Sequence, residues 1–209
     1  IRPLGRGRSI FSAVALFDSL RGRGFALLWG GQSVSRLGAS VYRIALAWWG
    51  LEETGSPRTM AAVLVFSFAP MLLFLLVGGV VVDRLPRIWV MLASDLIRGV
   101  LVAGIAALAV SDSLEIWHVF LASTVFGLVD AFFQPAYAAA VPQVTPAEAL
   151  PSANSLTSVS QQAIGIGGPA LGAILVATGG TSTAFTLDAA TFFISAGFLA
   201  FMPGRSHRV

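Results

Sequence analysis

Apolar residues along this chain gather in six long runs, separated by short segments rich in glycine, proline and serine. Each run is close to the ~20 residues that an α-helix needs to cross the hydrocarbon core of a membrane. The breaks include Gly55-Ser56-Pro57, Leu85-Pro86 and Gly179-Gly180, which are typical of turns. The pattern therefore predicts six membrane-spanning helices over residues 25–51, 59–82, 88–110, 116–141, 153–177 and 183–202.

This division predicts a six-helix bundle over residues 25–202, between an N-terminal segment of residues 1–24 and a tail of residues 203–209. In the N-terminal segment, Ile10, Phe11, Val14 and Phe17 recur at helical spacing, with arginine on both sides. A segment of this kind is either a helix that lies in the membrane interface or a frayed tail, and the pattern leaves both open.

Composition supports a membrane protein, because 56% of the residues are hydrophobic and only 11% are charged. Soluble domains carry roughly 25% charged residues, and this much apolar surface needs lipid as its solvent. The fold class expected is an all-α polytopic membrane protein. All 13 basic residues are arginine, and most of them flank apolar runs, so we expect the lipid bilayer, and no nucleic acid, as the partner of the basic charge.

The placement of arginine also predicts the orientation. Threading six helices puts one side of the membrane in contact with nearly all the flanking arginines, which are Arg2, Arg6, Arg8, Arg21, Arg23, Arg84, Arg87, Arg205 and Arg208. The other side receives only Arg58, beside Glu52 and Glu53. Because positive charge is retained in the cytoplasm, both termini are expected there.

Six charged residues fall inside the apolar runs: Arg36, Arg43, Asp95, Arg98, Asp130 and Asp188. Each costs roughly 2.5–3.5 kcal/mol to insert, so such residues usually face the bundle interior or a wet cavity. Polar residues share their helix faces, notably Gln134 with Asp130, and Asn154 on the fifth helix. We expect the first, fourth and fifth helices to surround a polar cavity, with the third and sixth more peripheral. Structural pairing between helices is the alternative explanation.

The chemistry of an enzyme is not visible in the sequence. There is no cysteine, the two histidines are His118 and His207, and no pair of residues has metal-ligand spacing. No cofactor, metal or catalytic residue is therefore expected.

Three sets of residues resemble a known family. Gly79, Asp83, Arg84 and Arg87, between the second and third helices, resemble the signature loop of the major facilitator superfamily. Gly168, Pro169 and Gly172 resemble the motif of its drug-type antiporters, with Ala173 in place of a final glycine. The stretches at residues 28–32, 130–136 and 152–156 are similar to the exporter branch that includes macrolide efflux proteins and the enterobactin exporter.

The resemblance implies a proton-coupled exporter of amphipathic small molecules, such as a drug, macrolide or siderophore, in a bacterial plasma or inner membrane. It implies that Asp83, Arg84 and Arg87 form a gating loop that contacts a partner half, and that Arg87 pairs with an acid such as Asp130. Arg36, Asp130, Gln134, Asp188 and Asn154 are the candidates for proton or substrate handling. Asp130 and Asp188 are the candidate coupling acids.

Members of this superfamily normally have twelve helices in two halves, each built from two inverted three-helix repeats. Six helices would make this chain the N-terminal half of an exporter. Two alternatives stay open: a half-size protein that forms a homodimeric transporter, and a non-transporting membrane subunit or truncated inactive product.

Overall fold

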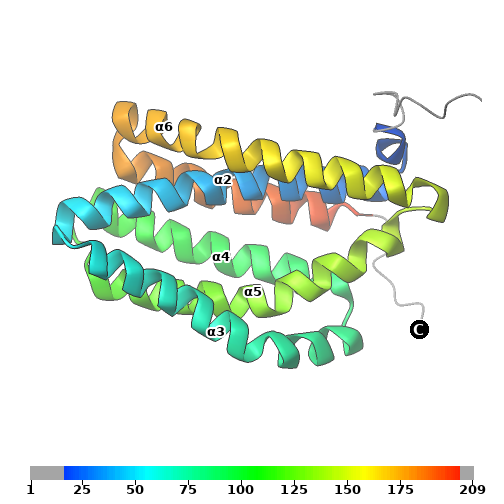
Figure 1. Ribbon diagram of the computed structural model, residues 1–209, viewed down its shortest axis with the longest axis horizontal. Coiled ribbons are helices and arrows are strands. Elements are labelled where there is room, and N and C mark those ends of the chain that lie inside the picture. Colours follow the sequence, from blue (N-terminus) through cyan, green and yellow to red (C-terminus); the bar gives the residue numbers. More distant parts are fainter. Residues whose placement is uncertain (1–16, 203–209) are drawn as a thin grey trace, which may run out of the picture.

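The computed structural model describes residues 17–202, and every regular element within that range is a helix (Figure 1). The N-terminal helical pattern falls largely on residues 1–16, which lie outside the described residues, as does the tail at 203–209. The elements are the 3₁₀ helix η1 (Asp18–Arg21), α2 (Arg23–Thr54), α3 (Pro57–Arg84), α4 (Arg87–Val110), α5 (Ile116–Val144), the 3₁₀ helix η2 (Ala147–Ala149) and α6 (Leu150–Ala200).

The first four predicted helices lie inside α2, α3, α4 and α5, and each observed helix begins and ends within a few residues of the prediction. The last two predicted helices both fall on α6, which ends two residues before the end of the sixth predicted range. Gly180, at φ 76° and ψ 172°, leaves the helical conformation in the middle of this element. Glycine adopts a positive φ without the steric cost of a Cβ, so the chain can reverse there. Figure 1 shows the chain returning alongside itself, as a first segment before Gly180 and a second segment after it.

Four helices of the described chain are long and apolar enough to cross a membrane: α3, α4, α5 and α6 with the η2 turn before it. Helix α2 is outside this group, although its 32 residues would span about 48 Å at 1.5 Å per residue. Polar residues such as Gln32 and Arg36 lower its hydropathy. Much of the polar surface of α2 faces other helices, where lipid solvation does not apply.

Helix α2 lies between the two segments of α6. A Cβ on Gly38 would lie 2.6 Å from Asp188 Oδ1 on the second segment. On the first segment, Cβ atoms on Gly168 and Gly172 would lie 2.5 Å from Ser40 Oγ and 3.0 Å from Ile44 Cβ, both on α2. The absence of side chains at these three positions permits the close approach of the helices.

The remaining helices complete a bundle with two sides. Helix α3 packs along α5, α2 packs along α6, and α4 contacts both α5 and α6, while α2 has few contacts with α3 or α5. Helix α4 therefore joins an α2–α6 side to an α3–α5 side, as Figure 1 shows.

Two apolar cores stabilise the bundle, and a polar layer separates them. One core contains Val41, Val102, Val119 and Phe185, and the other contains Leu28, Met91, Phe133 and Leu199. Along α2, α4 and the second segment of α6, buried polar residues fall between the members of the two cores: Gln32, Asp95, Arg98 and Ser195. The fold thus places its buried charge near the middle of its long axis.

Candidate functional site: a cleft with a charged base

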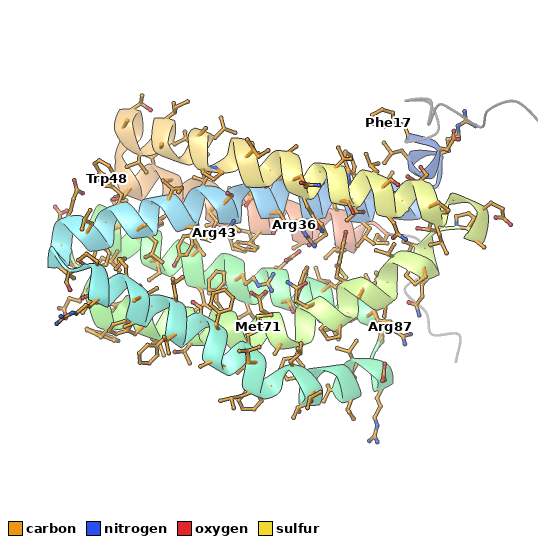
Figure 2. All side chains as sticks on the ribbon, viewed as in Figure 1. Phe17, Arg36, Arg43, Trp48, Met71 and Arg87 are labelled. Carbon is orange, nitrogen blue, oxygen red and sulfur yellow. The ribbon has the colours of Figure 1, made fainter. Side chains whose placement is uncertain are left out.

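A cleft of about 560 Å³ lies between the two sides of the bundle. Arg36 and Arg43 line it from α2, and Ser67 and Met71 line it from α3 (Figure 2). Many of the other lining residues are apolar: Ala39, Leu46, Met60, Val63, Leu64, Phe68, Phe126, Phe133, Ile164 and Phe192. Its size and mixed lining are those of a site for a drug-sized molecule.

The walls of the cleft differ from the sequence prediction, first in the part that α3 plays. Residues of α2, α5 and the first segment of α6 line the cleft as expected, but α3 supplies six lining residues: Met60, Val63, Leu64, Ser67, Phe68 and Met71. The prediction left α3 out because it carries little polar sequence. Close packing explains its position, since a Cβ on Gly127 of α5 would overlap the backbone carbonyl of Ser67.

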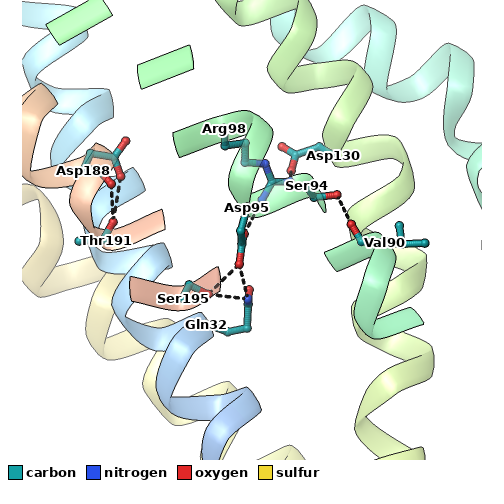
Figure 3. A network of polar contacts seen from close by, with 9 residues as sticks. All are labelled: Gln32, Val90, Ser94, Asp95, Arg98, Asp130, Asp188, Thr191 and Ser195. Atoms are coloured by element: carbon teal, nitrogen blue, oxygen red, sulfur yellow. Dashed lines mark hydrogen bonds and ion pairs between the residues drawn. The ribbon is translucent and has the colours of Figure 1, made fainter. Parts of the chain in front are cut away.

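The third and sixth predicted helices are not peripheral to the cleft. Helix α4 supplies Arg98 to its base, and the second segment of α6 supplies Phe192. Beneath them, Gln32 Nε2 donates hydrogen bonds to Asp95 Oδ2 at 3.2 Å and to Ser195 Oγ at 3.0 Å (Figure 3). Ser195 Oγ donates to Asp95 Oδ2 at 2.7 Å. These three buried side chains tie α2, α4 and α6 together.

Arg98 joins this buried layer to the open cleft. Its Nη1 lies 3.8 Å from Asp95 Oδ1, and its Nη2 forms an ion pair with Asp130 Oδ1 on α5. The guanidinium also lies 4.3 Å from the ring centroid of Phe133. The side chains of Arg98 and Asp95 are nearly inaccessible, whereas that of Asp130 is 35% exposed. Asp130 is thus the end of the charged network that molecules in the cleft can reach.

Asp130 does not pair with Arg87, which corrects the pairing implied by the family resemblance. Its ion pair is with Arg98, which lies further along α4 than Arg87 does. Arg87 is half-buried at the first position of α4, and its Nε has no hydrogen-bond partner among the described residues. The two positions are separated because Arg87 begins α4, whereas Arg98 lies three turns further along the same helix.

Asp188 lies outside the cleft lining. Its side chain is fully buried on the second segment of α6, where Oδ1 accepts a hydrogen bond of 3.3 Å from Thr191 Oγ1 (Figure 3). Its Oδ2 accepts no hydrogen bond from the described part of the chain. Gly38 of α2 covers this carboxylate. Asp188 and Asp130 therefore occupy different environments, one packed between helices and one at the cleft.

The other residues predicted to handle protons or substrate also divide into those that line the cleft and one that does not. Arg36 lines the cleft with its guanidinium 4.8 Å from the ring centroid of Tyr137, and Gln134 also lines the cleft. Asn154 is exposed near the start of α6 and is not part of the cleft lining.

The residues of the predicted gating loop lie at the junction of α3 and α4. Asp83 and Arg84 are the last two residues of α3 and are exposed. Gly79 has open space at its Cβ position, whereas a Cβ on the adjacent Gly78 would overlap the carbonyl of Ala131 on α5. Gly78, which was not a predicted site residue, is therefore the glycine that brings α3 and α5 together here.

Asp95 and Arg98 are among the six charged residues of the apolar runs, but they were not among the predicted site residues. The sequence prediction also missed Ser195 and the role of Gln32. The available signal was the cost of charge within an apolar run, which predicts a partner for Asp95 and Arg98. The identity of that partner depends on which helices are neighbours.

These features define a multi-pass α-helical membrane protein with a polar cleft between its helices. Residues 14–206 match the family described as transmembrane secretion effectors, and the chain belongs to that family of the major facilitator superfamily. Members of the family are transporters.

Three relatives illustrate the range of similar proteins. Macrolide efflux protein A of Streptococcus pyogenes is 28% identical over 151 residues, covering 72% of this chain and 37% of the relative. The uncharacterized MFS-type transporter YfiS of Bacillus subtilis is 30% identical over 183 residues, covering 87% and 42%. The multidrug efflux pump Tap of Mycolicibacterium fortuitum is 31% identical over 153 residues, covering 70% and 37%. The chain spans less than half the length of each of these relatives, and no solved structure matches it.

Proposed function

We propose that this protein is a secondary active transporter that exports amphipathic small molecules from a bacterial cell in exchange for protons. The observation that carries the proposal is the cleft, whose apolar walls lead to the ion pair of Arg98 and Asp130 at its base. The names of two relatives, a macrolide efflux protein and a multidrug efflux pump, support cargo of drug size.

The proposed topology has six spans, formed by α2, α3, α4, α5 and the two segments of α6. The reversal at Gly180 and the length of α2 support this count. Both termini then lie in the cytoplasm and the protein lies in the inner membrane, as the excess of arginine on one side indicates. In this arrangement the spans form two inverted three-helix repeats.

A second six-helix half completes the proposed transporter, supplied either by the same full-length chain or by a second copy. The exposed side chains of α3 support a further apolar partner or lipid on that side, since Leu72, Leu73 and Leu76 are 66%, 75% and 83% exposed. A chain that never assembles with another half would be a non-transporting membrane subunit.

The signature loop and the α6 motif have separate proposed roles. Asp83, Arg84 and Arg87, with Gly79, would stabilise one conformation by contacts with the second half, and the exposure of Asp83 and Arg84 supports such contacts. Gly168, Pro169 and Gly172 would permit α6 to move against α2, since both glycines lie at that contact.

Asp130 is the proposed coupling acid. Its carboxylate is within reach of the cleft and is held by Arg98, so a proton would compete with the arginine for it. Asp188 is the second candidate, with access only when α2 and α6 separate. Arg36 and Gln134 would contact the substrate within the cleft, and Asn154 would act outside the cleft.

The test is proton flux in liposomes that contain the full-length encoded protein, under an imposed pH gradient, with and without a macrolide. Macrolide-dependent proton movement would support the proposal. Protein that is folded and assembled but gives no flux with any amphipathic drug would contradict it. The native mass in nanodiscs, measured on the same sample, would distinguish one complete chain from a dimer of halves.

A further inference from the structure

The lining of the cleft carries an excess of positive charge. Its charged lining residues are Arg36, Arg43, Arg98 and Asp130. Asp130 forms its ion pair with Arg98, which also lies near Asp95. Neither Arg36 nor Arg43 has a carboxylate within 4.0 Å among residues 17–202. Because arginine keeps its proton in proteins, two guanidinium charges are left facing the cleft.

The two buried aspartates do not form an ion pair with Arg36 or Arg43. Asp188 is fully buried, receives its hydrogen bond from Thr191 and does not line the cleft. Asp95 is fully buried beneath Arg98 and is bonded to Gln32 and Ser195 (Figure 3). Asp95 is thus committed to the packing between helices, whereas Asp188 is within electrostatic range of Arg43 but not within 4.0 Å of it.

The two guanidiniums share one wall of the cleft. Arg36 and Arg43 are seven residues apart on α2, which is about 10.5 Å along a helix axis, and both lie on the face toward the cleft (Figure 2). Arg36 is half-buried beside the Tyr137 ring, and Arg43 is exposed. The opposite wall is apolar and adaptable, with Phe68 and Met71 on α3 and Phe126 on α5.

We infer that this cleft selects amphipathic molecules that carry an acidic group, with a carboxylate, sulfonate or phosphate bound by Arg36 and Arg43 and the apolar body against α3 and α5. Arginine binds such anions through charge-assisted hydrogen bonds, which are strong where water is largely excluded. A cationic molecule of the same shape is rejected by like charge. The inference deepens the proposed function and rests on the cleft being the transport site.

The experiment measures binding, so it can fail or succeed independently of transport. The full-length encoded protein in phosphatidylcholine nanodiscs is titrated with three probes that share one fluorescent dansyl body: anionic dansylglycine, neutral dansylamide and a cationic dansyl-aminoethyl-trimethylammonium. Dansyl emission gives each Kd, after subtraction of the signal from empty nanodiscs. The anionic probe should bind at least about tenfold more tightly than the other two.

Variants then assign the preference to the two arginines. The double variant Arg36→Gln/Arg43→Gln should remove the preference for the anionic probe. The matched control Arg58→Gln, which removes an exposed arginine outside the cleft, should retain it. Arg43→Lys keeps the charge and should retain most of the preference, which covers the case in which the double variant fails to fold.

Three results would overturn the inference: equal binding of the three probes, tighter binding of the cationic probe, or an unchanged preference in a folded double variant. Equal binding of the three probes would result if a carboxylate elsewhere in the full-length protein neutralised Arg36 and Arg43. Repeating the titration with phosphatidylglycerol in the nanodisc identifies the anion. Loss of dansylglycine binding there would mean that a lipid headgroup takes the site, and unchanged binding would mean that soluble anions do.

Discussion

Arg98 of α4 forms an ion pair with Asp130 of α5 at the base of the cleft, and through this pair the buried polar layer reaches the open cavity. On its other side, Arg98 lies 3.8 Å from the fully buried Asp95. One guanidinium therefore lies between two carboxylates, one on its own helix α4 and one on the neighbouring helix α5.

Removing the cation should destabilise the fold. Arg98→Met leaves Asp95 buried without a positive partner, and breaking a buried pair in this way costs about 3–5 kcal/mol. The free energy of unfolding in mixed micelles, measured by circular dichroism, would report the loss. The double variant Asp95→Asn/Arg98→Met should recover part of it, because no buried charge is then unpaired. A double variant as unstable as Arg98→Met would show that Asp95 does not depend on this cation.

Removing the accessible carboxylate should affect transport more than folding. In Asp130→Asn, Arg98 keeps Asp95 as a partner, so the variant should fold. If Asp130 accepts the coupling proton, proton-driven efflux should fall to the level of liposomes without protein. Asp112→Asn is the matched control, because Asp112 is exposed in the connection between α4 and α5. Efflux at the normal rate in Asp130→Asn would assign coupling to another residue, with Asp188 the next to test.

The contact of α2 with the second segment of α6 should be sensitive to one methyl group. Gly38→Ala would place a Cβ against the side chains of Asp188 and Thr191, at 2.6 Å from Asp188 Oδ1. Overpacking of this kind costs about 1–3 kcal/mol. Gly104→Ala on α4 is the control, because its Cβ has open space and alanine favours a helix over glycine. Chemical unfolding of both variants checks the prediction, and equal stabilities would argue against the close packing at Gly38.

Labelling of single cysteines should test the six-span topology and its orientation. The chain has no native cysteine, so each introduced thiol is unique. Arg84→Cys and Asn154→Cys should react with a membrane-impermeant maleimide only from the cytoplasmic side. Ser111→Cys and Thr178→Cys should react only from the outside, because Thr178 lies just before the reversal at Gly180. All four positions are exposed, so a different pattern would reflect topology and not burial.

The sequence by itself determined the helices and their lipid environment. Long apolar runs bounded by turn residues can satisfy their backbone hydrogen bonds within a membrane only as helices, so the predicted ranges coincide with α2 to α6 to within a few residues. The spacing of Gly168 and Gly172 is also a local signal, because small residues four apart on a helix favour close contact with another helix. Local sequence contains both kinds of information.

Only the tertiary structure decided which helices meet and which charges pair. Helix α3 lines the cleft although its sequence is almost wholly apolar, because Gly127 of α5 receives the backbone of α3 at Ser67. Asp130 pairs with Arg98 and not Arg87, and Asp188 is packed behind Gly38 while Arg36 and Arg43 face the cleft. Three arginines and three aspartates can be matched in several ways along the chain. The distances between helices select one of them, and a sequence does not contain those distances.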